Sequence, residues 1–209
     1  MRTTPTIVVA SALALAAGTS HAIIVASGGS TAVIAPPAST ALGALESNTD
    51  AWAFNEVQRF TLTTPLAVDA TTAGTYDSNA SLTPGIIPAG TMVNSHYIYS
   101  DPVGGAESVY EGFVRFSQPI IGIIIFRAGL NGSDAILGAA GTTYADNAAR
   151  GLELSANADR FVITLSRFEV RYNFRTSGAT DDIRVLTIPA PGAASLAAIG
   201  ALAIFRRRR

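Results

Sequence analysis

Short runs of β-branched, aliphatic and aromatic residues follow one another from Trp52 to Ile188, and Gly, Pro, Asn or Asp residues separate them. Runs of this length and composition are typical of β-strands. The pattern predicts strands over Phe54–Leu62, Leu66–Asp69, Met92–Ser100, Ser108–Phe116, Ile120–Arg127, Phe161–Leu165, Phe168–Phe174 and Ile183–Ile188.

Charged and apolar residues alternate in two of these runs. In Phe168–Tyr172 the charged residues Glu169 and Arg171 stand two positions apart, and in Glu111–Phe116 the charged residues stand four positions apart, with uncharged residues between them in both runs. Since side chains alternate between the two faces of a strand, one face of each run is predicted to be exposed and the other buried. We expect Glu111 and Glu169 on the exposed faces.

The segment Ile120–Phe126 is apolar on both faces, which predicts the central strand of a sheet. Gln118–Pro119 before it predicts a hairpin turn from the preceding strand. Helical signals are short, a single turn at Ser133–Leu137 and a second near Ala145–Ala149. Eight or so strands without helical periodicity predict an all-β fold, an antiparallel β-sandwich, and we expect a jelly-roll arrangement within that class.

The sandwich domain is predicted over residues 52–188. Residues 23–51 before it are rich in Ala, Ser, Thr, Gly and Pro, with Pro36-Pro37 in the middle. We interpret them as a low-complexity lead that is either loosely ordered or forms one early strand.

The N-terminal end has the pattern of a signal peptide. Arg2 precedes an apolar stretch, Ile7–Ala17, and Ser20-His21-Ala22 has the small-x-small form of a signal peptidase site. The alternative, a membrane span or buried helix, conflicts with the stretch's 11 residues, because a span needs about 20. We expect residues 1–22 to be removed after Ala22 and the rest to pass through the Sec translocon.

The C-terminal end has three parts in order. Pro189-Ala190-Pro191-Gly192 is followed by 13 uncharged residues, Ala193–Phe205, and then by Arg206, Arg207, Arg208 and Arg209. A helix of 13 residues spans about 20 Å, so we expect a temporary membrane anchor whose arginines stay on the cytoplasmic side. The alternative of a basic nucleic-acid-binding tail does not explain the apolar stretch.

These three parts resemble a PEP-CTERM sorting signal, the C-terminal tag that exosortases recognise and remove. The resemblance covers residues 188–209, and Ala190 stands where the motif has Glu. Parts of the domain, among them Thr91–Pro102 and Asp182–Thr187, also resemble uncharacterised β-sandwich domains carried by PEP-CTERM proteins. The resemblance implies processing by an exosortase-type enzyme and a surface or matrix location.

Composition narrows the classes of function. The 209 residues are 48% hydrophobic and 14% charged, the reverse of a disordered chain. No Cys is present, which excludes disulfides, thiol nucleophiles and Cys-ligated metals. Residues 23–188 keep nine arginines against 15 acidic residues, which gives a net charge of −6. We therefore expect no nucleic-acid partner.

Candidate catalytic groups are few. His96 is the only histidine after residue 22, and its neighbour Ser95 points to the opposite strand face, so we expect it to be packed rather than catalytic. An exported hydrolase would need a pair of carboxylates, and the candidates are Glu107, Glu111, Glu153 and Glu169.

Two binding sites are candidates. Acidic residues in predicted loops could bind calcium, which takes hard oxygen ligands; the candidates are Asp101, Asp134 and Asp146, with Asp181 and Asp182 also in predicted loops. The alternative is that they are turn residues. Tyr97 and Tyr99 share one strand face and could stack on sugar rings, unless they are half-buried sheet residues.

The sequence therefore predicts an exported, non-enzymatic cell-surface or extracellular-matrix protein, transiently anchored in the inner membrane by its C-terminal helix. A carbohydrate-binding or adhesive module, with extracellular polysaccharide as partner, is the first alternative. An exported hydrolase is the second.

Overall fold

The computed structural model describes residues 23–148, 150–155 and 158–189. The predicted signal peptide with Ala22, and the residues Ala190, Pro191, Gly192 and Arg206 to Arg209 of the predicted sorting segment, lie outside the described residues. Pro189 lies within them.

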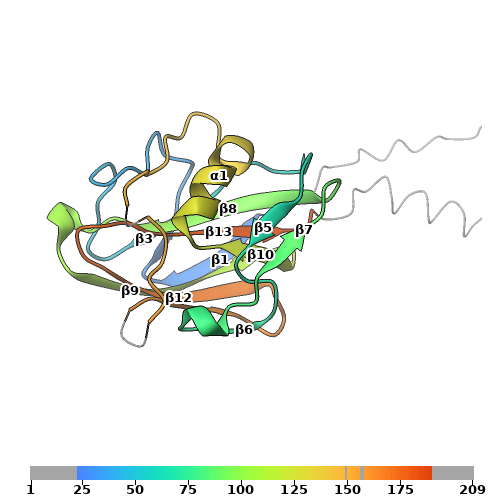
Figure 1. Cartoon of the computed structure of the whole chain (residues 1–209). Helices are drawn as coiled ribbons and strands as arrows, with labels where there is room; N and C mark the ends of the chain where they lie inside the picture. The colour runs from blue at the N-terminus through green and yellow to red at the C-terminus, as the bar shows by residue number, and fades with distance from the viewer. Residues whose placement is uncertain (1–22, 149, 156–157, 190–209) are drawn as a thin grey trace, which may run out of the picture. The chain divides into compact units, whose positions relative to one another are not determined.

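The described chain is an all-β fold of antiparallel sheets, with one α-helix among the residues described (Figure 1). Its strands are β1 Ile24–Gly29, β2 Thr31–Val33, β3 Ala51–Asn55, β4 Phe60–Thr61, β5 Leu66–Val68, β6 Gly74–Tyr76, β7 Gly85–Ile87, β8 Met92–Ser100, β9 Ser108–Phe116, β10 Ile120–Ile124, β11 Arg160–Ile163, β12 Glu169–Thr176 and β13 Asp181–Thr187. The helix is α1 Arg127–Leu137, and short 3₁₀ turns are η1 Asn79–Ser81 and η2 Val103–Gly105.

The strands form two main sheets. A five-stranded sheet has the order β1-β9-β12-β11-β6, and a six-stranded sheet has the order β10-β13-β8-β3-β2 with β4 also paired to β8. The pairs between these strands are antiparallel except β2 with β3, which is parallel. β5 and β7 form a separate two-stranded ribbon.

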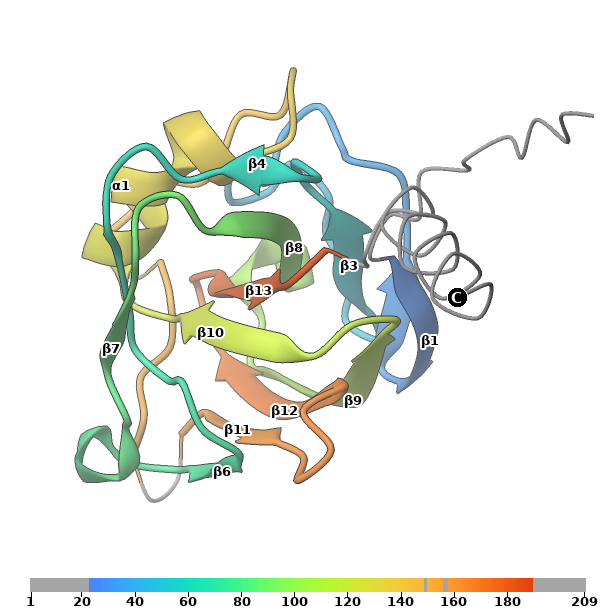
Figure 2. The same cartoon turned by 90° about the vertical axis from the view of Figure 1, so that its right-hand side faces the viewer.

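The six-stranded sheet is buried on both faces. One face packs on the five-stranded sheet, where Ile98 and Ile183 meet Phe174 in a shared core. The other face packs under α1, where Leu186 belongs to a second core with Leu130. Figure 2 shows β8 and β13 between these two layers. This position explains why β8 and β13 consist almost entirely of buried residues.

Two predicted strands are confirmed with the same bounds, β8 and β9. Alternation in β9 is also confirmed, since Glu111 and Arg115 are exposed while Val114 and Phe116 are buried. The prediction for Glu169 was wrong. It faces outward from β12, yet two arginine side chains cover it and leave it 4% exposed.

The predicted strand Phe54–Leu62 is broken in two. Arg59 has a φ of 58°, a left-handed conformation that ends strand pairing, and its N–H donates to Asn94 Oδ1 at 2.7 Å. β3 therefore ends at Asn55, and β4 begins at Phe60.

The predicted hairpin at Gln118–Pro119 was also wrong. β9 lies in the five-stranded sheet and β10 in the six-stranded sheet, so the connection crosses between the sheets. β10 is the edge strand of its sheet rather than a central one. It is buried because Ala70 pairs with Ile123 on its free side and closes that edge.

The helix is longer than predicted and begins earlier. α1 has 11 residues, and Ser133 lies in its interior, where its hydroxyl donates to Gly129 O at 2.7 Å rather than capping a first turn. No helix covers residues 145–148, the described part of the second predicted turn.

Residues 23–51 belong to the fold, which corrects the predicted domain boundary at residue 52. β1 pairs with β9 along the edge of the five-stranded sheet, and β2 pairs with β3. Of the two interpretations of this segment, an early strand is the one observed, and a second short strand follows it.

Candidate functional site

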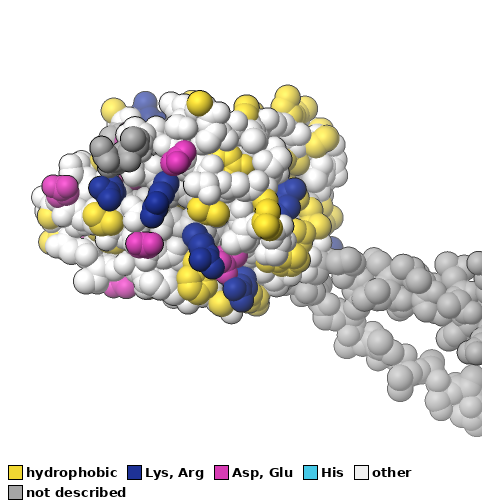
Figure 3. Space-filling model, turned by 90° about the horizontal axis from the view of Figure 1, so that it is seen from below, with side chains coloured by type: hydrophobic (Ala, Val, Ile, Leu, Met, Phe, Trp, Pro, Cys, Tyr) yellow, Lys and Arg dark blue, Asp and Glu magenta, His cyan; other side chains and the backbone are white. Residues whose placement is uncertain are grey.

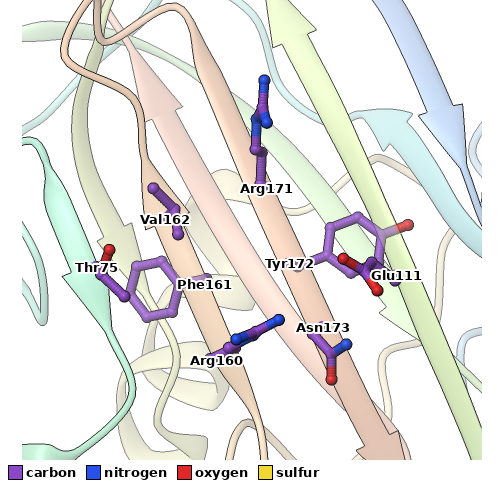
Figure 4. A pocket seen from close by; sticks show the side chains of 8 residues that line it. All are labelled: Thr75, Glu111, Arg160, Phe161, Val162, Arg171, Tyr172 and Asn173. Carbon is purple, nitrogen blue, oxygen red and sulfur yellow. The ribbon is translucent and has the colours of Figure 1, made fainter.

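A shallow groove lies on the outer face of the five-stranded sheet. One hollow of about 280 Å³ and a second of about 300 Å³ share Glu111, Arg171 and Tyr172 in their linings, so the two are continuous. The first hollow is drawn in Figure 4, where its side chains come from β6, β11, β12 and β9.

Strand register places these side chains in rows across the sheet. Arg171 on β12 stands opposite Phe113 on β9 and Val162 on β11, and in the next row Asn173 stands opposite Glu111 and Arg160. Phe161 and Tyr172, on alternate positions, point into the core, where their rings stack on Tyr76 and Phe174 at 4.6 and 4.4 Å between centroids.

Phe113 is the aromatic ring on this face. It lies over Gly28 of the neighbouring strand β1, where a Cβ would come within 2.6 Å of the ring. The absence of a side chain at Gly28 thus lets the Phe113 ring lie over the edge strand β1, and Arg171 stands opposite Phe113 on β12.

The outer face gathers four arginines, Arg115, Arg160, Arg171 and Arg175, although the domain as a whole is acidic. In Figure 3 this side of the molecule shows basic, acidic and hydrophobic side chains close together. Arg115 and Arg171 donate to opposite oxygens of Glu169 at 2.7 and 2.8 Å. Burial of Glu169 raises its pKa, but these hydrogen bonds outweigh that effect and hold the pKa below its usual range.

Arg160 and Arg175 form no ion pair with the residues that the structure describes. Their guanidinium groups lie on the same face as Arg171 and Phe113. An arginine-rich, partly apolar groove of this kind suits a planar or anionic ligand, since guanidinium groups bind carboxylates in a bidentate geometry and stack on apolar rings.

Tyr97 and Tyr99 are not at this groove, and the prediction that they stack on sugars was wrong. Both are fully buried between the six-stranded sheet and the layer of α1. Tyr97 packs against the ring of Tyr144 at 5.0 Å between centroids, and its hydroxyl donates to Asp182 Oδ1 at 3.0 Å. Two-residue spacing placed both tyrosines on one face correctly, but it could not tell that α1 covers that face.

The predicted calcium ligands Asp101, Asp134 and Asp146 do not form one site. Asp101 accepts backbone N–H bonds from Gly43 and Leu45, which are 58 and 56 residues away, so it joins two distant segments rather than its own turn. Asp146 pairs with Arg127 at 2.9 Å on the surface. Asp134 lies in α1 rather than in a loop.

Asp134 is held by two buried arginines. It accepts from Arg150 at 2.6 Å and from Arg184 at 2.9 Å. Both guanidinium carbons also lie within 6 Å of the Tyr97 and Tyr144 ring centroids. A carboxylate already paired in this way has no excess charge to offer a cation, so the network is structural.

His96 is packed, as expected. It is fully buried on β8, with Nδ1 2.7 Å from Asn55 Oδ1 and Nε2 3.1 Å from Thr187 Oγ1. Burial lowers its pKa to about 3, so the ring is neutral at physiological pH. Ser95 points to the opposite face and donates to Glu56.

Carboxylates gather elsewhere. Glu111 is the one carboxylate that lines the groove, and among the described residues Glu107 is exposed in the loop after η2. Glu153 lies in a cluster with Asp159 and Asp181. No spacing pattern along the chain indicates this cluster, because its members come from three separate segments. Of the groove arginines, Arg171 could have been found from the exposed positions of the alternating strand Phe168–Phe174, whereas Arg160 lies just before the predicted strand Phe161–Leu165.

No protein-family model, curated protein or solved structure compared with this chain matches it. Within the described ranges no helix is long and apolar enough to span a membrane, since α1 has 11 residues.

Proposed function

We propose that this chain is an exported, non-enzymatic cell-surface or extracellular-matrix protein that is sorted through residues 189–209. The order of parts at the C-terminus carries the proposal: Pro-Ala-Pro-Gly, 13 uncharged residues and four arginines. The position of this segment supports it, because β13 ends at Thr187, two residues before Pro189. The segment therefore follows the last strand and can be removed without taking a strand from either sheet.

The partners in this proposal are the Sec translocon, signal peptidase, an exosortase-type enzyme and the inner membrane. The four arginines hold the end of the chain on the cytoplasmic side until processing. The domain is a jelly-roll-like sandwich in this proposal, and the crossings between sheets at β8–β9, β9–β10 and β12–β13 favour that arrangement.

Deletion of residues 193–209 tests the sorting role. The truncated protein should appear in the periplasm or medium, without the cell-associated form that the full chain gives in fractionated cells. Replacing Arg206 to Arg209 by lysine is the matched control, since positive charge and membrane orientation are kept. A truncated protein that stays as cell-associated as the full chain would contradict the proposal.

The groove favours a second candidate function, binding of an acidic extracellular polysaccharide. Arg160 and Arg171 offer guanidinium groups in neighbouring rows, and Phe113 offers a ring between the sheet edge and Arg171. Carboxylates of uronic acids match the charge of this face, and the sugar ring matches the aromatic surface.

The double variant Arg160→Ala/Arg171→Ala tests this candidate. Retention of the protein on immobilised polyuronate should fall at least tenfold, and wild-type retention should weaken with added salt, because exposed charges are screened. Arg127→Ala is the control, since Arg127 is an exposed arginine on α1. Equal retention of both variants would rule out the groove as the binding face.

A further inference from the structure

Three carboxylates from different segments meet at one end of the fold. Glu153 follows Leu152 in the segment that passes β13, Asp159 directly precedes β11, and Asp181 is the first residue of β13. One carboxylate oxygen from each lies within 4.8 Å of the others. Asp159 and Asp181 are fully buried, and Glu153 is exposed, so the cluster is reached from solvent on the Glu153 side.

Asp181 is the decisive member of this cluster. Neither of its carboxylate oxygens has a hydrogen-bond partner among the residues that the structure describes, although the residue is fully buried. Buried carboxylates in native proteins are bonded to donors, to cations or to protons, because an uncompensated buried charge is very costly. Asp181 therefore needs either a proton or a bound cation to compensate its buried carboxylate.

Asp159 is fixed by the backbone. Its Oδ1 accepts the N–H of Arg175 at 2.7 Å, and its Oδ2 accepts the N–H of Glu153 at 2.9 Å. The Asp159 N–H in turn donates to Glu153 O at 3.2 Å. These bonds hold two of the three carboxylate-bearing segments together and leave each Asp159 oxygen a further lone pair.

The charges around the cluster are mostly of one sign. Asp182 is the next residue to Asp181, and Arg175 is the basic residue that acts on Asp159, from an exposed position on β12. Burial, and then repulsion from Asp159, Glu153 and Asp182, raise the pKa of Asp181 to about 10. The pKa values of Asp159 and Glu153 are raised as well, in both cases chiefly by burial. The geometry carries the argument for a cation: three carboxylate oxygens lie within 4.8 Å of one another, and two of the three residues are buried.

We propose that Glu153, Asp159 and Asp181 bind one Ca²⁺ ion, which joins the start of β13 to the segments before β11. Calcium accepts irregular sets of oxygen ligands and keeps water in the remaining positions, whereas Mg²⁺ demands a near-ideal octahedron. Glu153 is exposed, so an ion can reach the cluster from its side. With three carboxylates the affinity should lie near that of extracellular modules, a Kd of about 0.1–1 mM. The inference does not depend on the proposed sorting function.

The competing arrangement is a proton shared between Asp159 and Asp181. It would satisfy the buried charge without any metal, and it predicts that calcium changes nothing. Replacing Asp181 by Asn relieves the repulsion among the three carboxylates in both arrangements, so the stability of that variant does not distinguish them. The change in stability on adding calcium does.

The test uses the full chain, stripped with a chelator, and follows its melting temperature and Tb³⁺ luminescence during titration with Ca²⁺ up to 10 mM. The expected result is a melting temperature that rises through the millimolar range and a Tb³⁺ signal that Ca²⁺ displaces. In Asp181→Asn both responses should be lost. Asp77→Asn is the matched control, because Asp77 is exposed between β6 and η1, and it should respond like the wild type.

A second variant covers the case in which Asp181→Asn does not fold. Glu153→Gln changes only the exposed ligand and should weaken the calcium response about tenfold with the fold intact. The proposal is overturned if calcium leaves the melting temperature and the Tb³⁺ signal of the wild type unchanged, if Asp181→Asn and Glu153→Gln respond like the wild type, or if Mg²⁺ alone produces the response.

Discussion

Arg184 and Glu56 form a bidentate ion pair in the interior, with Nε–Oε2 and Nη2–Oε1 distances both of 2.7 Å. Both side chains are fully buried. The pair joins β13 to the chain just after β3, under α1, and Arg184 also donates to Ser133 Oγ at 2.6 Å in that helix. The largest of the fully buried side chains is thus an arginine on β13 whose donors reach α1 and the segment after β3.

Breaking this pair should be costly. Glu56→Gln leaves the buried guanidinium of Arg184 without its full countercharge, and the free energy of unfolding should fall by about 3–5 kcal/mol. Urea denaturation measures this. Asp146→Asn is the control, because it breaks a solvent-exposed pair with Arg127 and should leave stability nearly unchanged. Similar losses in both variants would contradict a structural role for the buried network.

Removal of the Tyr97 hydroxyl should lower the stability of the protein without changing its binding to polyuronate. The hydroxyl accepts from Arg150 Nη2 at 2.7 Å and donates to Asp182, so Tyr97→Phe leaves buried charged groups short of one bond each. The free energy of unfolding should fall by about 1–3 kcal/mol. Retention on polyuronate should not change, since Tyr97 is not exposed. A variant of normal stability that loses retention would contradict the burial of this residue.

The metal-free protein should lose stability as the pH rises from 7 to 9. The pKa of Asp181 is raised to about 10, so the folded protein holds a proton that the unfolded chain released near pH 4. The folded state then binds more protons than the unfolded state, and stability declines as the pH approaches the folded pKa. Denaturation in chelator at pH 7, 8 and 9 measures the slope, which Asp181→Asn should flatten and saturating Ca²⁺ should reverse. A flat wild-type profile would contradict the raised pKa.

The measurement is made above pH 7 because, at lower pH, His96 changes the stability of the protein in the opposite direction. Its pKa falls to about 3, so between pH 3 and 6.5 the unfolded chain binds the extra proton and stability rises with pH. Burial raises the pKa of Asp182 to about 6, so the contribution of Asp182 to stability falls as the pH rises toward 6. The two effects overlap below pH 6.5 and are absent above it.

Two glycines should respond oppositely to alanine. A Cβ at Gly112 would meet Thr31 Oγ1 at 2.4 Å and Tyr172 Oη at 2.7 Å, so Gly112→Ala should reduce the free energy of unfolding by about 1–3 kcal/mol. Gly132 lies inside α1 with open space around its Cβ position. Gly132→Ala should add up to about 1 kcal/mol, because alanine favours helices. Equal effects in a denaturation series would contradict the close contact of β9 with β2 and β12.

The local pattern of apolar and polar residues predicted the strands that have an exposed face or a continuous apolar run. It also predicted the bounds of β8 and β9. It did not predict which sheet receives each strand, because the turn at Gln118–Pro119 looks the same whether the chain folds back or crosses. It left an early strand and a loosely ordered lead open for residues 23–51, because the Ala, Ser and Gly residues of β1 gain their order from pairing with β9. The break at Arg59 depends on Asn94, 35 residues away.

The candidate sites were harder to predict than the fold. Asp residues in turns were visible in the sequence, but the three that meet are set by β13, β11 and the segment before them. Tyr97 and Tyr99 alternate as surface residues would, but the layer over the six-stranded sheet, which includes α1 and Tyr144, buries them. Burial by a distant element leaves no local signal in the chain.

The intact mass of the protein recovered from membrane, surface and medium fractions of its host tests the central claim most directly. The account predicts a mature form in the surface or medium fraction that begins at Ile23 and ends near Pro189 to Pro191. A protein that keeps residues 1–22 and still ends at Arg209, recovered from the cytoplasm, would contradict it.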